Sequence, residues 1–390
     1  MNQGKYVFSQ VTAFLPSRVF DGCVSKYGGN KWVKHFSCWN QLLCMMFGQL
    51  SGRESLRDLL TVLGAHTAKY FHLGFGDNVS RTNLARANES RDWHIFETFA
   101  MALIADARKC CAQESEFSLD IDGNVYAFDS TTIDLCLNVF LWATFRRAKG
   151  AVKLHTLYDV RTSIPSFVLV TPASVHDVRA LDNLTYEAGA YYLLDRAYID
   201  FERLYTIHEH KAFFVTRAKT NMRFRRLSSA TPNRDVGVIS DQVIRFHGKK
   251  SKQRYPGIMR RIRFRDSVQN RTFVFLTNNF NIQAEQVALL YKYRWSIELF
   301  FKWIKQHLKI ETFWGTTENA VKTQVYIAVA TYTLIAIMKH KLKLTRSTYE
   351  ILQIIGASLL DKTPLAELLA PETNTDKIPE TQFSLQFAPI

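Results

Sequence analysis

The sequence predicts an α/β fold in which a sheet-forming core follows a helical N-terminal region. Residues 1–115 place apolar side chains at helical spacing. From about residue 120, short β-rich runs are joined by helical segments, which is typical of an α/β core. A strongly basic block at 217–271 contains further strand-like runs, so we interpret it as a β-rich insertion in the core.

These patterns divide the chain into five regions, and its length of 390 residues allows two or three domains. The regions are a helical N-terminal domain at 1–115, the first part of the core at 120–216, the basic β-rich insertion at 217–271, the second part of the core at 272–345, and a C-terminal helical and tail region at 346–390.

Two of the strands expected in the core end in an aspartate. The strand candidates are Val125–Asp129, Val152–Val160, Phe167–Val170, Tyr191–Asp195, Ala212–Thr216 and Thr272–Thr277, and helices are expected at 178–188, 200–210, 282–290 and 291–308. The most apolar run, Val325–Met338, is shorter than the roughly 20 residues that span a membrane. We expect it to be a buried core helix.

The positive charge is concentrated in the basic block. The formal net charge is +15, and Arg217–Arg265 carries fifteen Lys and Arg residues against two acids, Asp235 and Asp241. Such an excess indicates a polyanionic partner, usually nucleic acid or an anionic membrane. A membrane surface is disfavoured because no amphipathic helix sets bulky apolar residues opposite Lys and Arg. A solvated basic surface remains the alternative.

One segment of the N-terminal domain has the features of a DNA-contacting helix. Ser80 is expected to cap a helix, and the residues after it include Arg81, Arg86 and Arg91. A small helical module with exposed arginines is able to dock in a DNA groove. An ordinary helical bundle with surface arginines accounts for the same pattern, and both interpretations stay open.

Asp129 and Asp195 are candidate ligands for a divalent cation. Each follows an apolar strand, and ligands of open α/β sheets bind at the carboxyl ends of strands. A single aspartate in this position is usually a cap or a turn residue. Two of them suit a hard divalent cation, which binds clustered carboxylate oxygens. His155 and His176 lie between them without a His-x-x-x-His pair, and we expect a structural or supporting role for both.

A third acid lies on a polar stripe of a predicted helix. At 100° per residue, Tyr291, Arg294, Glu298 and Lys305 fall within about 60° of one another. A solvated helix face with an ordinary Arg294–Glu298 pair is the plain alternative. The stripe also suits a site that needs one carboxylate for a metal ion and two cations for phosphates.

The spacing Tyr291-x2-Arg294-x3-Glu298-x6-Lys305 resembles the Y-R-E-K signature of transposases of the fourth insertion-sequence family. Phe128-Asp129-Ser130-Thr131 is similar to the first-aspartate motif of this family. Asp195-Arg196-Ala197-Tyr198 is similar to the second, although the family commonly has Gly where this chain has Ala197. The resemblance extends from about residue 124 to residue 323, and it includes a long gap with a β-rich insertion before the glutamate.

The resemblance implies a ribonuclease-H-like catalytic core in which Asp129, Asp195 and Glu298 converge to hold two Mg²⁺ ions, with Mn²⁺ able to replace them. Two metal ions activate the attacking oxygen and stabilise the leaving oxygen of an in-line displacement. Double-stranded DNA would be the substrate. The expected DNA-binding residues are Tyr291, Arg294, Lys302, Lys305, Arg223, Arg225 and Arg226.

The implied function is excision and integration of an insertion sequence. Water would cleave DNA at terminal inverted repeats, and the freed 3′-hydroxyl would then join target DNA. A homodimer on DNA and a cytoplasmic location are expected, with reduced cysteines that form no C-x-x-C zinc motif. The alternatives are a metal-dependent nuclease without strand transfer and a domesticated DNA-binding protein without catalysis.

Overall fold

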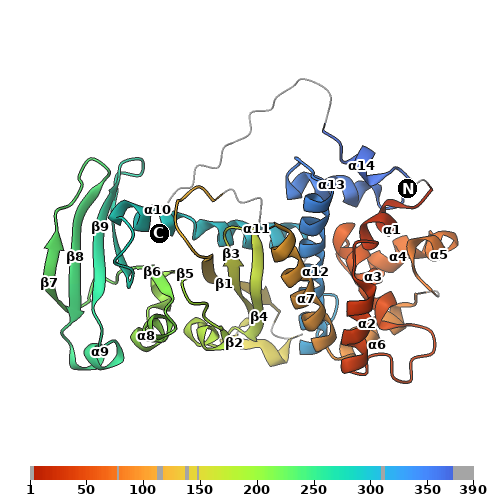
Figure 1. Ribbon diagram of the computed structural model, residues 1–390. Helices are drawn as coiled ribbons and strands as arrows, with labels where there is room; N and C mark the ends of the chain where they lie inside the picture. The colour runs from red at the N-terminus through yellow and green to blue at the C-terminus, as the bar shows by residue number, and fades with distance from the viewer. Residues whose placement is uncertain are drawn as a thin grey trace.

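The computed structural model describes residues 4–76, 79–111, 117–136, 140–146, 149–308 and 312–371. Its N-terminal region is helical, as the sequence predicts (Figure 1). Ser80 caps the sixth helix, where its Oγ accepts a hydrogen bond of 3.1 Å from the N–H of Asn83. The helices are α1 (Val7–Thr12), α2 (Ser17–Lys26), α3 (Cys38–Leu50), α4 (Leu56–Gly64), α5 (Tyr70–Leu73), α6 (Arg81–Ser90) and α7 (His94–Cys111).

The described residues form one mixed sheet of ten strands. Its order is β2-β3-β1-β5-β6-β10-β9-β8-β7, and β4 pairs with β3. The strands β1, β5 and β6 are parallel to one another, whereas β3 is antiparallel to β1 and β4. The bounds are β1 (Val125–Leu135), β2 (Thr144–Arg146), β3 (Lys149–Asp159), β4 (Ile164–Pro172), β5 (Tyr191–Leu194), β6 (Phe213–Arg217), β7 (Phe224–Ala230), β8 (Val238–Phe246), β9 (Met259–Asp266) and β10 (Arg271–Thr277).

The strands of the basic block extend the central sheet (Figure 1). Strand β10 joins the two parts because it pairs with β9 on one side and with β6 on the other. The only helix described inside the block is the short α9 (Lys249–Arg254). The block is therefore β-rich as predicted, and it continues the sheet outward to the edge strand β7.

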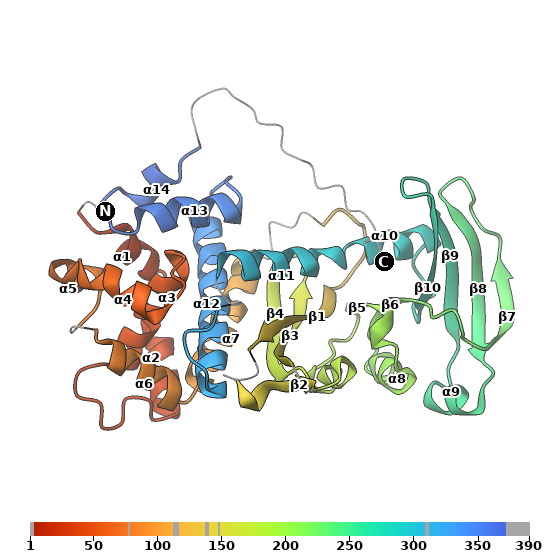
Figure 2. The same ribbon diagram turned by 180° about the vertical axis from the view of Figure 1, so that it is seen from behind.

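The helices that follow the strands depart from the predicted bounds in two places. The segment expected to be helical at 178–188 forms a 3₁₀ helix that ends at Asn183, whereas α8 (Phe201–Glu209) begins as expected after its cap Asp200. The two helices predicted at 282–290 and 291–308 are α10 (Ala284–Lys292) and α11 (Trp295–His307). The break therefore lies at Tyr293 and Arg294. Figure 2 shows α10 and α11 following one another nearly in line beside the sheet.

The apolar helix α12 (Glu318–Lys341) joins the N-terminal helices to the sheet. It packs against α7, α3 and α6 and also contacts α11 and β4. Its length and composition suit a membrane span, but 89% of its most apolar window is buried inside the protein. The prediction of a buried core helix at Val325–Met338 is confirmed. Helices α13 (Thr348–Ser358) and α14 (Leu365–Leu368) follow, and the expected polar tail lies beyond the described residues.

The sheet separates two hydrophobic cores. One contains the N-terminal helices, α10, α11 and α12, and the other lies against α8 and part of the basic block. Because side chains alternate along a strand, β1 contributes Val125 and Ala127 to the first core and Tyr126 and Phe128 to the second. This alternation decides which face each later side chain of the strand occupies.

Gly123 sets the start of β1 and offers a test of the fold. Its φ is +86°, and a Cβ at this position would collide with the carbonyl oxygen of Gly189 beside β5. We expect Gly123→Ala to lower the free energy of unfolding by about 1–3 kcal/mol, measured by urea denaturation. Gly189→Ala is the matched control, since Gly189 has φ +79° with open space around it. Equal losses in the two variants would contradict the close approach.

Candidate active site

Strand register brings Asp129, Asp195 and Arg217 side by side. In the parallel pair of β1 and β5, Phe128 lies opposite Leu194, and in the pair of β5 and β6, Leu194 lies opposite Thr216. Asp129, Asp195 and Arg217 each come one residue later. They therefore form a row across three adjacent strands at the carboxyl edge of the sheet, the edge at which such sheets bind ligands.

The same alternation turns both aspartates toward the glutamate helix. Ala127 belongs to the core under α11 and Phe128 to the opposite core, so Asp129 faces α11. The residues of β5 alternate in the same way, which turns Asp195 to this face as well. Glu298 lies on the first turn of α11. We call Asp129, Asp195 and Glu298 the carboxylate cluster.

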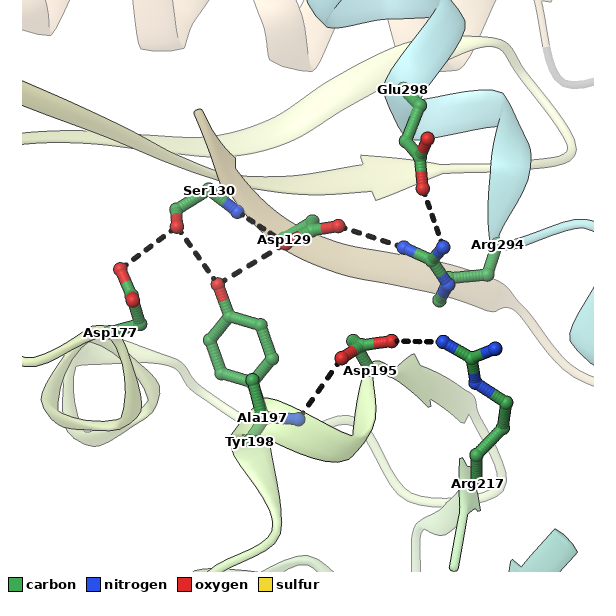
Figure 3. Close-up of polar contacts among 9 residues, drawn as sticks. All are labelled: Asp129, Ser130, Asp177, Asp195, Ala197, Tyr198, Arg217, Arg294 and Glu298. Carbon is green, nitrogen blue, oxygen red and sulfur yellow. Dashed lines mark hydrogen bonds and ion pairs between the residues drawn. The ribbon is translucent and has the colours of Figure 1, made fainter. Parts of the chain in front are cut away.

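A buried guanidinium lies within the carboxylate cluster (Figure 3). Arg294 donates from Nη1 to Asp129 Oδ2 at 2.8 Å and from Nη2 to Glu298 Oε1 at 2.5 Å. Its side chain is only 7% exposed. The two ion pairs tie the start of α11 to β1, and they hold two of the three acids on opposite sides of one positive charge.

The environment shifts the pKa values of the site in different directions. Burial raises the pKa of Asp129 to about 6, although Arg294 and the N–H of Ser130 act in the opposite direction. Burial also works against the charge on Asp195, but the N–H of Ala197 and the guanidinium of Arg217 outweigh it and lower the pKa of this carboxyl. For Arg294, burial is outweighed by its contacts with Tyr291, Asp129 and Glu298, which raise its pKa.

A hydrogen-bonded chain supports Asp129 from the far side. Tyr198 donates to Asp129 Oδ1 at 3.4 Å and to Ser130 Oγ at 3.1 Å, and Ser130 donates to Asp177 Oδ1 at 2.9 Å (Figure 3). Lys153 Nζ lies 3.0 Å from Asp177 Oδ1. Because Asp129 receives hydrogen bonds on one oxygen and Arg294 on the other, its carboxylate plane is held in one orientation.

The two histidines near these hydrogen-bonded residues, His155 and His176, differ in exposure. His155 is fully buried, its Nδ1 lies 3.9 Å from Asp177, and burial lowers its pKa to about 4. His176 is exposed at the surface. Neither contacts a member of the carboxylate cluster in the hydrogen bonds described. The buried, neutral His155 agrees with the structural role expected for it.

Tyr291 does not present its side chain to solvent as a DNA-contacting residue would in this conformation. It is 4% exposed, at the end of α10, and its ring lies 5.8 Å from the guanidinium carbons of both Arg217 and Arg294. Burial raises the pKa of Tyr291 to about 12. The polar stripe predicted for one helix is thus divided between α10 and α11. Tyr291 is buried, and its ring packs against the guanidinium groups of the two arginines.

Two lysines of α11 lie on the outer side of the site. Lys305 donates to the backbone carbonyl of Thr132 at 2.8 Å, which joins α11 to the far end of β1. Lys302 is exposed. Both therefore remain accessible at the surface, whereas Arg294 is buried among the acids.

The basic block contains both exposed and structural arginines. Arg223, which precedes β7, and Arg225 and Arg226 of this edge strand are exposed, as contact with DNA would require. By contrast, Arg217 pairs with Asp195 at 2.9 Å, and Arg260 is buried against Asp241 at 2.6 Å. The count of fifteen cations therefore overstates the charge that is available to a ligand.

Among the N-terminal arginines, Arg81 and Arg86 are exposed on α6, but Arg91 is not on the helix. Arg91 lies at the C-cap and donates to the carbonyl of Ser37 at 2.9 Å, to Gln41 Oε1 at 3.0 Å and to the carbonyl of Phe36. Of the two interpretations left open for this segment, DNA contact therefore concerns Arg81 and Arg86, and Arg91 has a structural role. Its role is to brace the loop before α3.

The side chains of the carboxylate cluster are suited to bind divalent cations, but Arg294 occupies the space between two of them. Asp129 and Glu298 share the guanidinium of Arg294, and Asp195 pairs with Arg217 on the neighbouring strand. Carboxylate oxygens are the donors that Mg²⁺ prefers. Within the described residues, however, no three Asp, Glu, His or Cys side chains are grouped closely enough to hold a metal ion. The expected convergence is therefore incomplete, because Arg294 stands between Asp129 and Glu298.

Several residues of the site were not identified from the sequence. Ser130 and Tyr198 fall inside the two aspartate motifs, but only their neighbours were assigned roles. Asp177 follows His176, and nothing in its local pattern links it to Ser130. Arg217 was counted with the basic block. Its position after an apolar strand, like that of Asp129 and Asp195, is the signal that places it at the same sheet edge.

The chain is similar to known transposases over most of its length. The family described as "Transposase DDE domain" matches residues 121–334, more than half of the chain. This range contains all three members of the carboxylate cluster. A second family, described only as a domain of unknown function, matches residues 3–76 in the N-terminal helical region. The DDE family implies a ribonuclease-H-like core for the sheet described above.

Three relatives carry transposase names. A putative transposase of Sinorhizobium fredii is 32% identical, over 74% of this chain and 80% of its own length. The probable transposase for insertion sequence element IS5377 of Geobacillus stearothermophilus is 34% identical, over 58% of this chain and 59% of its own length. The putative transposase for insertion sequence element IS4SA of Synechocystis is 23% identical, over 67% of this chain and 73% of its own length. The chain therefore belongs to the DDE transposase family of insertion-sequence elements.

Proposed function

We propose that this protein excises and integrates an insertion sequence by metal-dependent phosphoryl transfer at the carboxylate cluster. The observation that carries the proposal is that buried Arg294 pairs with both Asp129 and Glu298, while Asp195 follows the strand next to that of Asp129 at the same sheet edge. Membership of a DDE transposase family supports DNA as the substrate. Cleavage at terminal inverted repeats would come first, and joining of the freed 3′-hydroxyl to target DNA would follow.

Each member of the cluster has a distinct role in this proposal. Asp129, Asp195 and Glu298 would hold two Mg²⁺ or Mn²⁺ ions. When bound, the ions activate the attacking oxygen and stabilise the leaving oxygen. Tyr198 and Ser130 keep the carboxylate of Asp129 oriented, and Arg217 keeps Asp195 ionised. Lys302 and Lys305 would position the DNA backbone across the site, the latter after giving up its bond to Thr132.

Arg294 has two successive roles in the proposed cycle. In the closed state it neutralises Asp129 and Glu298, which would otherwise repel each other. When the acids take up cations, the guanidinium is released and becomes available to a DNA phosphate, which it is able to clamp with two hydrogen bonds. Arg294 thus exchanges carboxylates for phosphate and does not stand permanently on a DNA-facing surface.

A nuclease that cleaves without strand transfer would share the same cluster. The two functions differ in what happens to the 3′-hydroxyl, so a labelled end fragment incubated with a plasmid target separates them. Joined product supports the transposase, and cleaved ends alone support the nuclease. A homodimer on DNA is proposed because transposition must bring two ends together. Light scattering of the protein–DNA complex measures this directly.

Isosteric changes in the cluster test its chemical role. Asp129→Asn, Asp195→Asn and Glu298→Gln should each reduce Mg²⁺-dependent cleavage of a labelled end fragment below detection, because each removes a negatively charged oxygen ligand. DNA affinity in metal-free buffer should change little. Asp134→Asn is the matched control, since Asp134 is an exposed acid on the same strand β1. Full cleavage by the Glu298→Gln variant would refute the catalytic role of the carboxylate cluster.

Arg294→Ala tests the exchange of carboxylates for phosphate. Without DNA, the variant should bind Mn²⁺ roughly tenfold or more tightly than the parent, because hydrogen bonds between charged groups contribute about 1.5–3 kcal/mol and no longer compete. Its affinity for a DNA end in the presence of metal should fall. Calorimetric titration with Mn²⁺ measures the first effect and fluorescence anisotropy the second.

Arg294→Lys is the control for charge alone, because an ammonium is unable to bridge Asp129 and Glu298 in the way that the forked guanidinium does. We expect it to restore DNA affinity only in part. Thermal melts of both variants check that the fold is retained. Parental Mn²⁺ affinity in a folded Arg294→Ala variant would mean that Arg294 does not close the site.

The edge of the sheet provides a test of DNA tracking. Arg225 lies directly opposite Arg245 on β8, and both are exposed, so two like charges face each other. Neither forms an ion pair with another of the described residues. Bound phosphate would relieve this repulsion. Neutralising Arg223, Arg225 and Arg226 together should flatten the salt dependence of duplex binding, by about 0.9 in logarithmic slope for each phosphate that the protein no longer neutralises.

The matched control for this triple variant neutralises Lys341, Lys343 and Lys362, which are exposed and lie near the end of α12 and beyond it. It removes the same formal charge from a different surface. A slope that changes equally in both triple variants would show that net charge alone governs binding, and that the edge strand has no specific part in it.

A further inference from the structure

A pocket lined by cationic side chains lies beside an exposed tryptophan in the N-terminal helical region. The pocket has a volume of about 570 Å³ and lies between the loop at 27–36 and α6. Its lining includes Lys31, Trp32, Lys34 and Arg86. Most of the loop precedes α3 and lies inside the segment matched by the family of unknown function. The pocket shares no residue with the carboxylate cluster.

The loop is held firmly on both sides. Asn30 Oδ1 accepts a hydrogen bond of 2.8 Å from the N–H of Cys38 at the start of α3, and the N–H of Gly29 donates to the carbonyl of Val24 at 2.9 Å. Arg91 binds the carbonyls of Phe36 and Ser37 from the end of α6. The position of the tryptophan is therefore set by the fold.

Trp32 carries two costs that folding does not explain. Its indole side chain is 90% exposed, and its φ of +63° lies in the left-handed region that bulky residues avoid. Residues held in such conformations are concentrated at functional sites. The nearby Lys31 Nζ lies 5.9 Å from the ring centroid, so the flat apolar surface and a positive charge are presented together.

The charges around the pocket select an anionic ligand. Lys31, Lys34 and Arg86 are exposed, and they outnumber the acid that lines the pocket, Asp92, whose Oδ1 accepts a hydrogen bond of 3.0 Å from the backbone N–H of His94. A ligand that pairs negative charges with apolar sugar and base edges suits cations beside an aromatic ring, and duplex DNA has both. A protein partner would need acidic and apolar groups in the same arrangement.

We propose that this pocket binds the duplex DNA of the element's end, with Trp32 packed against a base or sugar edge and Lys31, Lys34 and Arg86 on the flanking phosphates. The choice of DNA rests on the proposed function. The binding itself requires neither metal ions nor the carboxylate cluster. Trp32 would therefore be an anchor that engages the end before chemistry begins.

The test uses the full chain in metal-free buffer with a fluorescent duplex that carries the element's end. Trp32→Ala should weaken binding about tenfold or more, because the apolar surface of the indole is no longer buried against the duplex. Trp32→Phe should retain part of the affinity. The matched control is Phe71→Ala, because Phe71 is a similarly exposed aromatic residue of the same region, at 83%, on α5 away from the pocket.

The charges give a second, independent readout. Lys31→Gln and Lys34→Gln should each reduce the logarithmic salt slope by about 0.9, whereas Trp32→Ala should leave the slope unchanged. The control Phe71→Ala should bind the end duplex and cleave it in Mg²⁺ like the parent, because Phe71 lies outside the pocket. If the parent itself cleaves nothing, the proposed function fails, while the metal-free binding result still decides this inference.

Two results would overturn the inference. The first is parental affinity for the end duplex in a folded Trp32→Ala variant. The second is a change of oligomeric state without DNA, in which the parent is a dimer by light scattering and Trp32→Ala is a monomer. In that case the exposed indole belongs to an interface between two copies of the chain.

Discussion

The ion pairs of one buried arginine hold the candidate site together. Arg294 follows the break between α10 and α11, and its guanidinium joins Asp129 on β1 to Glu298 on α11. A buried charge without partners would be costly, so the arginine and the two acids depend on one another. The glutamate helix is docked on the sheet by the same charges that we propose to bind cations and phosphate.

The geometry beneath this interaction comes from the parallel strands. Register places Asp129, Asp195 and Arg217 in one row, and alternation of side chains turns the aspartates toward α11. The basic strands β7 to β9 extend the same sheet, so the exposed arginines of the edge strand β7 and the carboxylate cluster belong to one sheet. On the opposite side, α12 fixes the N-terminal helices to the core, which places the Trp32 pocket on the same rigid framework.

Much of this arrangement could be predicted from the sequence, because local patterns encode it. Apolar runs that end in Asp129 and Asp195 indicated two strands and their functional edge, and the cap at Ser80 indicated a helix start. The burial of Tyr291 could not be predicted, since a helical wheel assumes an unbroken helix and says nothing of what covers each face. The same limit applies to Arg217, whose partner is 22 residues away in sequence and adjacent only in the sheet.

The most direct test of the central claim locates the cations on the polypeptide. Fe²⁺ replaces Mg²⁺ in many oxygen-donor sites, and with ascorbate and peroxide it cuts the backbone close to where it is bound. The account predicts cuts near residues 129, 195 and 298, suppressed by excess Mg²⁺, and stronger in Arg294→Ala than in the parent. Cuts confined to other segments, or cuts that Mg²⁺ does not suppress, would contradict the assignment of the carboxylate cluster as the catalytic centre.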